Sequence, residues 1–143
     1  MIWNDSWKQS ELNSCGFDID DDKNDGSGCA IDNYGLDDKI IVGKTDKNSD
    51  VYDTLHFARR DIEEATIPPF IKYISPSAFN TCRKLRKIQF SENSELISIE
   101  SNSLSETSIE NITIPSHVKS IGYNAFYFCY HLKKVEFLND SEL

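Results

Sequence analysis

Residues 67–96 return 47 positions later as residues 114–143, without an insertion or deletion. The two segments, IPPFIKYISPSAFNTCRKLRKIQFSENSEL and IPSHVKSIGYNAFYFCYHLKKVEFLNDSEL, are identical at 13 of 30 positions. Unrelated segments of this length would share roughly two identities, so the chain contains a true internal repeat. Such a chain must stack its units, because one short unit cannot bury its own apolar edge.

The repeat also has a shorter period. An L-x-x-I-x-I pattern occurs four times, beginning at residues 62, 85, 109 and 132, in steps of 23, 24 and 23 residues. The last two apolar positions of the pattern alternate, as a strand with one buried face requires. We therefore predict a solenoid of about four units, whose like strands pair in parallel at about 4.8 Å.

The remainder of each unit follows from local signals. Pro68 and Pro115 end the first strand, because proline has no amide to donate to a ladder. Residues 70–74 and 117–121 are predicted to form a second, shorter extended segment. Residues 75–79 and 122–126 are predicted to form tight helical turns, each of which places a Phe in the core.

Composition changes along the chain. Trp3, Trp7 and Leu12 are spaced for one short amphipathic helix, whereas residues 16–35 are rich in Asp, Asn, Gly and Ser and lack a regular apolar period. Residues 1–36 are therefore predicted to form an acidic, irregular or partly disordered N-terminal arm. The β-rich runs IIVGK and VYDTLHFA predict a hairpin lead-in over residues 37–60. With the repeats of residues 60–143, this hairpin is expected to form one domain, residues 37–143.

Two segments share the signature IP-x-x-V/I-x-x-I-x-x-x-AF-x-x-C-x-x-L-x-x-I/V-x-F, which is seen at residues 67–90 and 114–137. In this signature the chain resembles the BspA-like leucine-rich repeat of bacterial and protist surface proteins, over residues 60–143 and, through the lead-in, to about residue 39. The resemblance implies a leucine-rich-repeat solenoid, a right-handed β/α superhelix with mostly short parallel strands and short helical turns. It further implies cell-surface recognition or adhesion through protein or glycan contacts, with no catalytic residues to transfer.

Other functions stay open from the sequence. The chain could be an intracellular scaffold or adaptor, or a truncated fragment of a longer repeat protein with no independent function. Its N-terminus lacks the basic start and apolar stretch of a signal peptide, and no run of 18 apolar residues occurs. We therefore expect no membrane insertion by this chain. Its localisation is left open, and a cell-surface location follows from the resemblance alone.

Charge and motifs disfavour several activities. The net charge is −9, and the first 50 residues carry 12 acidic and 5 basic side chains. Such a chain would be repelled by nucleic-acid phosphates, so we expect no nucleic-acid partner. No G-x-S-x-G, phosphate-binding Gly loop or H-E-x-x-H motif occurs, so we expect a non-enzymatic protein without a cofactor.

The cysteines show no metal-binding spacing. Cys82 and Cys129 occupy the same place in two units that lie two strand spacings apart. That separation, about 10 Å, exceeds the roughly 7 Å Cα limit for a disulfide, so we predict two free, buried, structural cysteines. Cys15 and Cys29 could pair with each other in an oxidising compartment.

The acidic segment 21–32 superficially follows a calcium-binding loop. Lys23 stands where an oxygen ligand is needed, and Asp32 is shorter than the usual bidentate Glu. We therefore interpret the segment as a solvated acidic loop and expect no metal site.

Two sets of side chains are candidates for binding a partner. The first set is the exposed face of the predicted parallel sheet, where leucine-rich repeats usually bind partners. The second is a basic edge that precedes the strands, which either stays solvated and pairs with Glu110 or binds an anionic ligand such as an acidic protein segment or a sulfated glycan. The exposed-face residues are Lys87, Gln89, Asn111, Thr113, Lys134 and Glu136, and the basic-edge residues are Arg83, Lys84, Arg86 and Lys133.

Leu143 aligns with Leu96, which in the complete copy leads into another unit. The last strands are therefore expected to form a bare end that exposes apolar side chains and unpaired backbone. We predict self-association through this C-terminal end, or fraying there.

Overall fold

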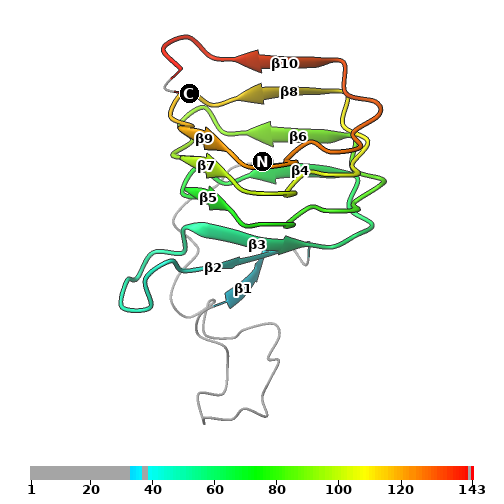
Figure 1. Cartoon of the computed structure of the whole chain (residues 1–143). Coiled ribbons are helices and arrows are strands. Elements are labelled where there is room, and N and C mark those ends of the chain that lie inside the picture. Colours follow the sequence, from blue (N-terminus) through cyan, green and yellow to red (C-terminus); the bar gives the residue numbers. More distant parts are fainter. Residues whose placement is uncertain (1–32, 37–38, 142) are drawn as a thin grey trace.

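The computed structural model describes residues 33–36, 39–141 and 143 (Figure 1). Most of the predicted N-terminal arm, with Cys15, Cys29 and the acidic segment 21–32, lies outside the described residues.

The described chain is a β-solenoid of about four turns, in which short strands stack along one axis (Figure 1). One sheet of this part of the chain has six strands in the order β1-β2-β3-β5-β7-β9, and two further pairs are β4-β6 and β8-β10. The first sheet comprises β1 (Asn33–Leu36), β2 (Ile40–Gly43), β3 (Thr54–Ala58), β5 (Tyr73–Ile74), β7 (Ser98–Ile99) and β9 (Ser120–Ile121). The pairs comprise β4 (Glu64–Ile67), β6 (Lys87–Phe90), β8 (Asn111–Ile114) and β10 (Lys134–Phe137).

The four paired strands are the strands predicted from the L-x-x-I-x-I pattern. Each pair is parallel, with Ile67 opposite Phe90 and Ile114 opposite Phe137. Like strands pair in parallel within β4-β6 and β8-β10, as predicted, but β6 and β8 lie in separate sheets. The connection from Phe90 to Ile99 is two residues longer than that from Ile67 to Ile74. We attribute the interruption to this longer connection.

The hairpin lead-in is also present. β2 and β3 pair antiparallel, with an irregularity between Ile41 and Val42. β1 pairs antiparallel with β2, so a strand lies within the segment that the sequence predicts to be irregular through residue 36. The sheet then continues in parallel through β5, β7 and β9. β5 and β9 lie within the predicted second extended segments, and β7 takes the same place in the middle unit.

The turns at residues 75–79 and 122–126 are not helical, contrary to the prediction. Their backbones contain residues with positive φ, including Ser77 at 62° and Asn124 at 56°. In the first turn, every second backbone amide donates its hydrogen bond to the next unit rather than within the turn. Phe79 N, for example, donates to the Ser103 carbonyl oxygen at 2.7 Å. Hydrogen bonds between units, rather than helix propensity, therefore fix the conformation of these turns.

The core repeats from unit to unit. Ile74 and Ile99 are fully buried, as are Phe79 and Leu104, which occupy one equivalent position in successive units. In the final unit the equivalent Phe126 is only partly buried. The core is therefore thinner at the C-terminal end of the described solenoid.

The two repeat cysteines are free, as predicted. Cys82 is fully buried, but Cys129 is only partly buried, because it lies in the final described unit. Its thiol donates to the Leu104 carbonyl oxygen at 3.0 Å. Thr107 takes the cysteine position of the middle unit, and its hydroxyl donates to the same carbonyl oxygen at 3.0 Å. The position held by Cys82, Thr107 and Cys129 in three successive units therefore carries a short side chain with one hydrogen-bond donor.

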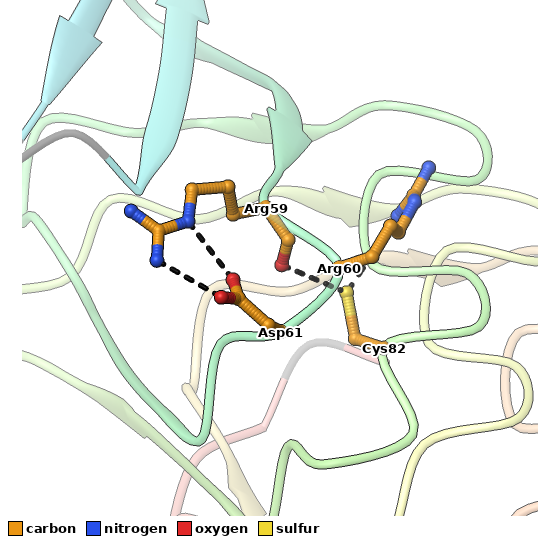
Figure 2. A network of polar contacts seen from close by, with 4 residues as sticks. All are labelled: Arg59, Arg60, Asp61 and Cys82. Carbon is orange, nitrogen blue, oxygen red and sulfur yellow. Dashed lines mark hydrogen bonds and ion pairs between the residues drawn. The ribbon is translucent and has the colours of Figure 1, made fainter.

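Arg60 covers Cys82 from the N-terminal side (Figure 2). Its Nη1 donates to the Ala78 carbonyl oxygen at 3.1 Å and lies 3.6 Å from Cys82 Sγ, while the thiol points toward the Arg59 carbonyl oxygen at 3.5 Å. Burial raises the pKa of the Cys82 thiol, so this thiol is a neutral structural group at pH 7. Next to it, two hydrogen bonds from Arg59 lower the pKa of Asp61.

One polar group in the core has no partner among the described residues. Ser103 is fully buried and its hydroxyl oxygen makes no hydrogen bond, whereas Ala78 and Ala125 occupy the same position in the neighbouring units. We expect Ser103→Ala to raise the free energy of unfolding by about 1 kcal/mol, because it removes a buried unsatisfied hydroxyl. Urea denaturation followed by circular dichroism measures this change. Ser101→Ala, at a partly exposed position, is the control, and a destabilised Ser103→Ala variant would contradict the argument.

Candidate binding surface

The outward side chains of β4, β6, β8 and β10 form one surface, which we call the outer face. It brings together all six residues that the sequence assigned to the exposed face of the sheet. Parallel pairing sets Asn111 beside Lys134 and Thr113 beside Glu136. Lys87 and Gln89 project in the same way from β6, and all six side chains are exposed.

The sequence prediction omitted the two residues that β4 adds to the outer face. Glu64 lies beside Lys87 and Thr66 beside Gln89 in the β4-β6 pair. The L-x-x-I-x-I pattern already marks this unit, so its outward positions 64 and 66 could have been found from the sequence.

A groove of about 900 Å³ crosses the outer face where the ladder is interrupted. Lys87 and Gln89 line it from β6, and Asn111 and Thr113 line it from β8. The loop at residues 91–95, which follows β6, contributes its wall. The interruption of the sheet therefore creates a hollow at the centre of the predicted site.

The groove combines polar and apolar surface and carries both signs of charge. Glu64 and Glu110 contribute carboxylates, and Lys87 contributes an ammonium group. Apolar contact comes from Phe90, which is partly buried, and from Leu138. Such a lining suits a partner that offers both donors and acceptors.

The basic edge is largely paired with acids of adjacent units. Arg83 Nη2 donates to Glu106 at 2.7 Å, and Lys133 Nζ donates to Glu110 at 3.0 Å. The hydrogen bond from Lys133 is the main reason why the pKa of Glu110 is lowered. Arg86 lies 3.8 Å from a carboxylate oxygen of Glu63. These exposed pairs contribute little to stability, but they cancel much of the positive charge along the edge.

Lys84 is the remaining residue of the predicted basic edge, and it has no ion-pair partner among the residues that the structure describes. It lines a hollow of about 350 Å³ together with Arg83, Arg86, His131 and the carboxylates of Glu63 and Glu110. The mixed charge of this hollow favours a paired, solvated edge over a stripe for anionic ligands.

Other kinds of site are not found in the described part of the chain. Within residues 33–36, 39–141 and 143, no three His, Cys, Asp or Glu side chains converge on a possible metal ion. No helix in these ranges is long and apolar enough to span a bilayer.

Stacked parallel strands that recur every 23 or 24 residues define a leucine-rich-repeat solenoid. Residues 53–142 match the BspA type leucine rich repeat region (6 copies), and the chain belongs to this family. Proteins of this kind are repeat-based binding modules. Comparison with curated proteins finds no match.

Several solved structures share this fold. The pneumococcal vaccine antigen PcpA is 32% identical, with a TM-score of 0.59 over 66% of this chain and 24% of that chain. A leucine rich cell surface protein from Faecalibacterium prausnitzii is 28% identical, with a TM-score of 0.52 over 57% of this chain and 20% of that chain. A leucine-rich repeat protein from Bacteroides capillosus is 27% identical, with a TM-score of 0.54 over 62% of this chain and 64% of that chain. The chain thus spans less than two thirds of each relative.

Proposed function

We propose that the chain is a non-enzymatic recognition module of a cell-surface protein, which binds a protein partner in the groove of the outer face. The observation that carries this proposal is the groove itself, which lies over the interrupted ladder and is lined by Lys87, Gln89, Asn111 and Thr113. The vaccine antigen and the cell surface protein among the structural relatives support a location outside the cell.

A protein partner fits the lining better than a glycan does. Sugar rings pack well on exposed aromatic faces, and the outward positions of the four strands hold no aromatic side chain. The alternation of acidic, basic and amide side chains instead matches a polypeptide surface, whose charges and amides vary over a similar distance. Without an aromatic anchor, the affinity for one partner is expected to be modest.

The site is tested by placing a photo-reactive amino acid at Asn111, in the groove, or at Asn48, which is exposed in the loop between β2 and β3. Irradiation on intact source cells should attach a protein to the Asn111 variant and not to the Asn48 variant. Periodate treatment of the cells, which destroys glycans, should leave this adduct unchanged. Equal labelling from both positions would show that the groove is not the binding site. Loss of the adduct after periodate treatment would show that the partner is recognised through a glycan.

A further inference from the structure

The two ends of the groove differ in charge. β6 and β8 run in the same direction, so one end of the groove lies beside their first residues and the other beside their last residues (Figure 1). Near the first residues the lining carries both signs of charge, from Glu64, Arg86, Lys87 and Glu110. At the other end, which we call the exit end, the lining includes the carboxylates of Glu92 and Glu95, and His117 from the segment after β8.

The two carboxylates of the exit end are not neutralised within the described chain. Glu92 and Glu95 are both exposed, and neither forms an ion pair with another described residue. Glu110, toward the other end, is in contrast paired with Lys133 at 3.0 Å. Two unpaired carboxylates on one short loop attract a cation from outside the chain.

The loop at residues 91–95 holds these carboxylates in a fixed wall. Glu95 N donates to the Pro69 carbonyl oxygen of the preceding unit at 3.0 Å, and Ser91 Oγ donates to the Ile67 carbonyl oxygen at 3.2 Å. Within the loop, Ser94 N donates to the Ser91 carbonyl oxygen at 3.0 Å, and Ser94 is buried. The loop is therefore anchored at both ends, and a ligand would not have to order it.

Phe90 supplies apolar surface next to this wall. It is the last residue of β6, is partly buried and lines the groove directly before the acidic loop. A side chain with an apolar stem and a cationic head fits such a ring beside carboxylates. Arginine fits best, because its planar guanidinium stacks on aromatic rings and donates to more than one carboxylate oxygen. The chain itself contains such a contact, since Arg60 lies over the Phe57 ring, 4.2 Å from its centroid.

The exit end is complete within the described solenoid. β4 and β6 lie on one side of the groove, and β8 and β10 lie on the other. The equivalent connections after Ile67 and Ile114 read PPFIK and PSHVK and hold no acidic residue. The fold therefore does not require the two glutamates in this place, which favours a role in binding.

We propose that the exit end takes an arginine side chain of the protein partner, with its stem on Phe90 and its guanidinium between the carboxylates of Glu92 and Glu95. This inference rests on the proposed function, because it names a residue of the partner that binds in the same groove. The net charge of −9 also favours a partner with a basic surface, since it attracts such a partner at long range.

A pair of short peptides tests the arginine site on the 143-residue chain. One peptide is acetyl-Gly-Arg-Gly-amide, and in the other an uncharged citrulline replaces the arginine. In NMR titrations of the isotope-labelled chain, the arginine peptide should shift the amide signals of Glu92 and Glu95. Its dissociation constant should be in the millimolar range, as a single bound side chain allows. The citrulline peptide should bind at least tenfold more weakly.

Two double variants show whether the carboxylates are responsible. Glu92→Gln with Glu95→Gln keeps the size of both side chains and should weaken binding of the arginine peptide at least tenfold. Asp46→Asn with Asp50→Asn is the matched control, because it makes the same change in net charge at exposed positions of the loop between β2 and β3. This control should leave the dissociation constant unchanged.

The outcomes separate this inference from the proposed function. The arginine site is overturned if the arginine peptide causes no shifts, if citrulline binds equally well or if the glutamine variants bind as before. Labelling of a protein on cells from position 111 would then still support the groove. Arginine binding without such labelling would overturn the proposed function instead. Where both hold, the two glutamine substitutions should reduce the labelling from position 111 at least fivefold, and unchanged labelling would show that no arginine of the partner binds here.

Discussion

Phe79→Ala is expected to lower the free energy of unfolding by about 3–5 kcal/mol, the range for removing a fully buried aromatic side chain. Phe79 has no exposed surface and lies in the first complete unit of the solenoid. Its amide donates to the Ser103 carbonyl oxygen of the next unit, which holds the turn in place around the ring. Because the turn is fixed by these hydrogen bonds, it cannot collapse easily into the cavity that alanine would leave.

Phe126→Ala makes the same change at the same position of the last described unit. Phe126 is only partly buried, so its truncation should cost less than half as much as that of Phe79. Both variants can be measured by urea denaturation followed by far-UV circular dichroism. Equal losses in the free energy of unfolding for the two variants would show that the last described unit is packed as tightly as the first.

The sequence predicted the strands well because their signal repeats. In L-x-x-I-x-I the buried positions are set by the two-residue period of a strand. Because the units stack, the same positions are buried in each unit, and every repeat of the pattern supports the same assignment. Ile88, Ile112 and Ile114 were thus placed inside from spacing alone, and all are buried. The outward positions followed by elimination, which is why the exposed-face candidates lie together on the outer face.

The turns were not predictable in the same way. Thr81 has a φ of 62°, although a β-branched residue strongly disfavours positive φ. It adopts this conformation because its amide donates to the Ser105 carbonyl oxygen of the next unit at 3.0 Å. A local pattern cannot reveal a conformation that a neighbouring unit imposes. β1 was missed for a related reason, since its strand is defined by pairing with β2 and follows a Gly- and Asp-rich segment.

The sequence placed the candidate residues on one face, but it did not predict the shape of that face. Lys87, Gln89, Asn111 and Thr113 were placed on one face, yet the groove between them depends on the missing ladder between β6 and β8. The longer connection after Phe90 is visible in the sequence, but its effect on strand pairing is not. Nor does the sequence show which acids reach the basic edge, since that depends on the direction of long side chains across units.

Gly122→Ala is expected to lower the free energy of unfolding by about 3 kcal/mol, at the upper end of the usual cost of overpacking. A Cβ at this position would lie 2.5 Å from Ser101 N and 2.7 Å from the Glu100 carbonyl carbon. Both atoms belong to the backbone, so no side chain can rotate to relieve the clash. Gly122 N also donates to the Ile99 carbonyl oxygen at 2.7 Å, which holds the two units close together.

From the repeat alignment alone, Gly122→Ala would be expected to be tolerated, because the equivalent positions of the other units hold Ser75 and Glu100 and so accept side chains. At Gly122, however, the backbone of the middle unit lies too close to leave room for a side chain. Ser120→Ala, two residues earlier at an exposed position of β9, is the control and should change stability by no more than about 0.5 kcal/mol. A Gly122→Ala variant as stable as this control would show that the last described unit shifts to admit a methyl group.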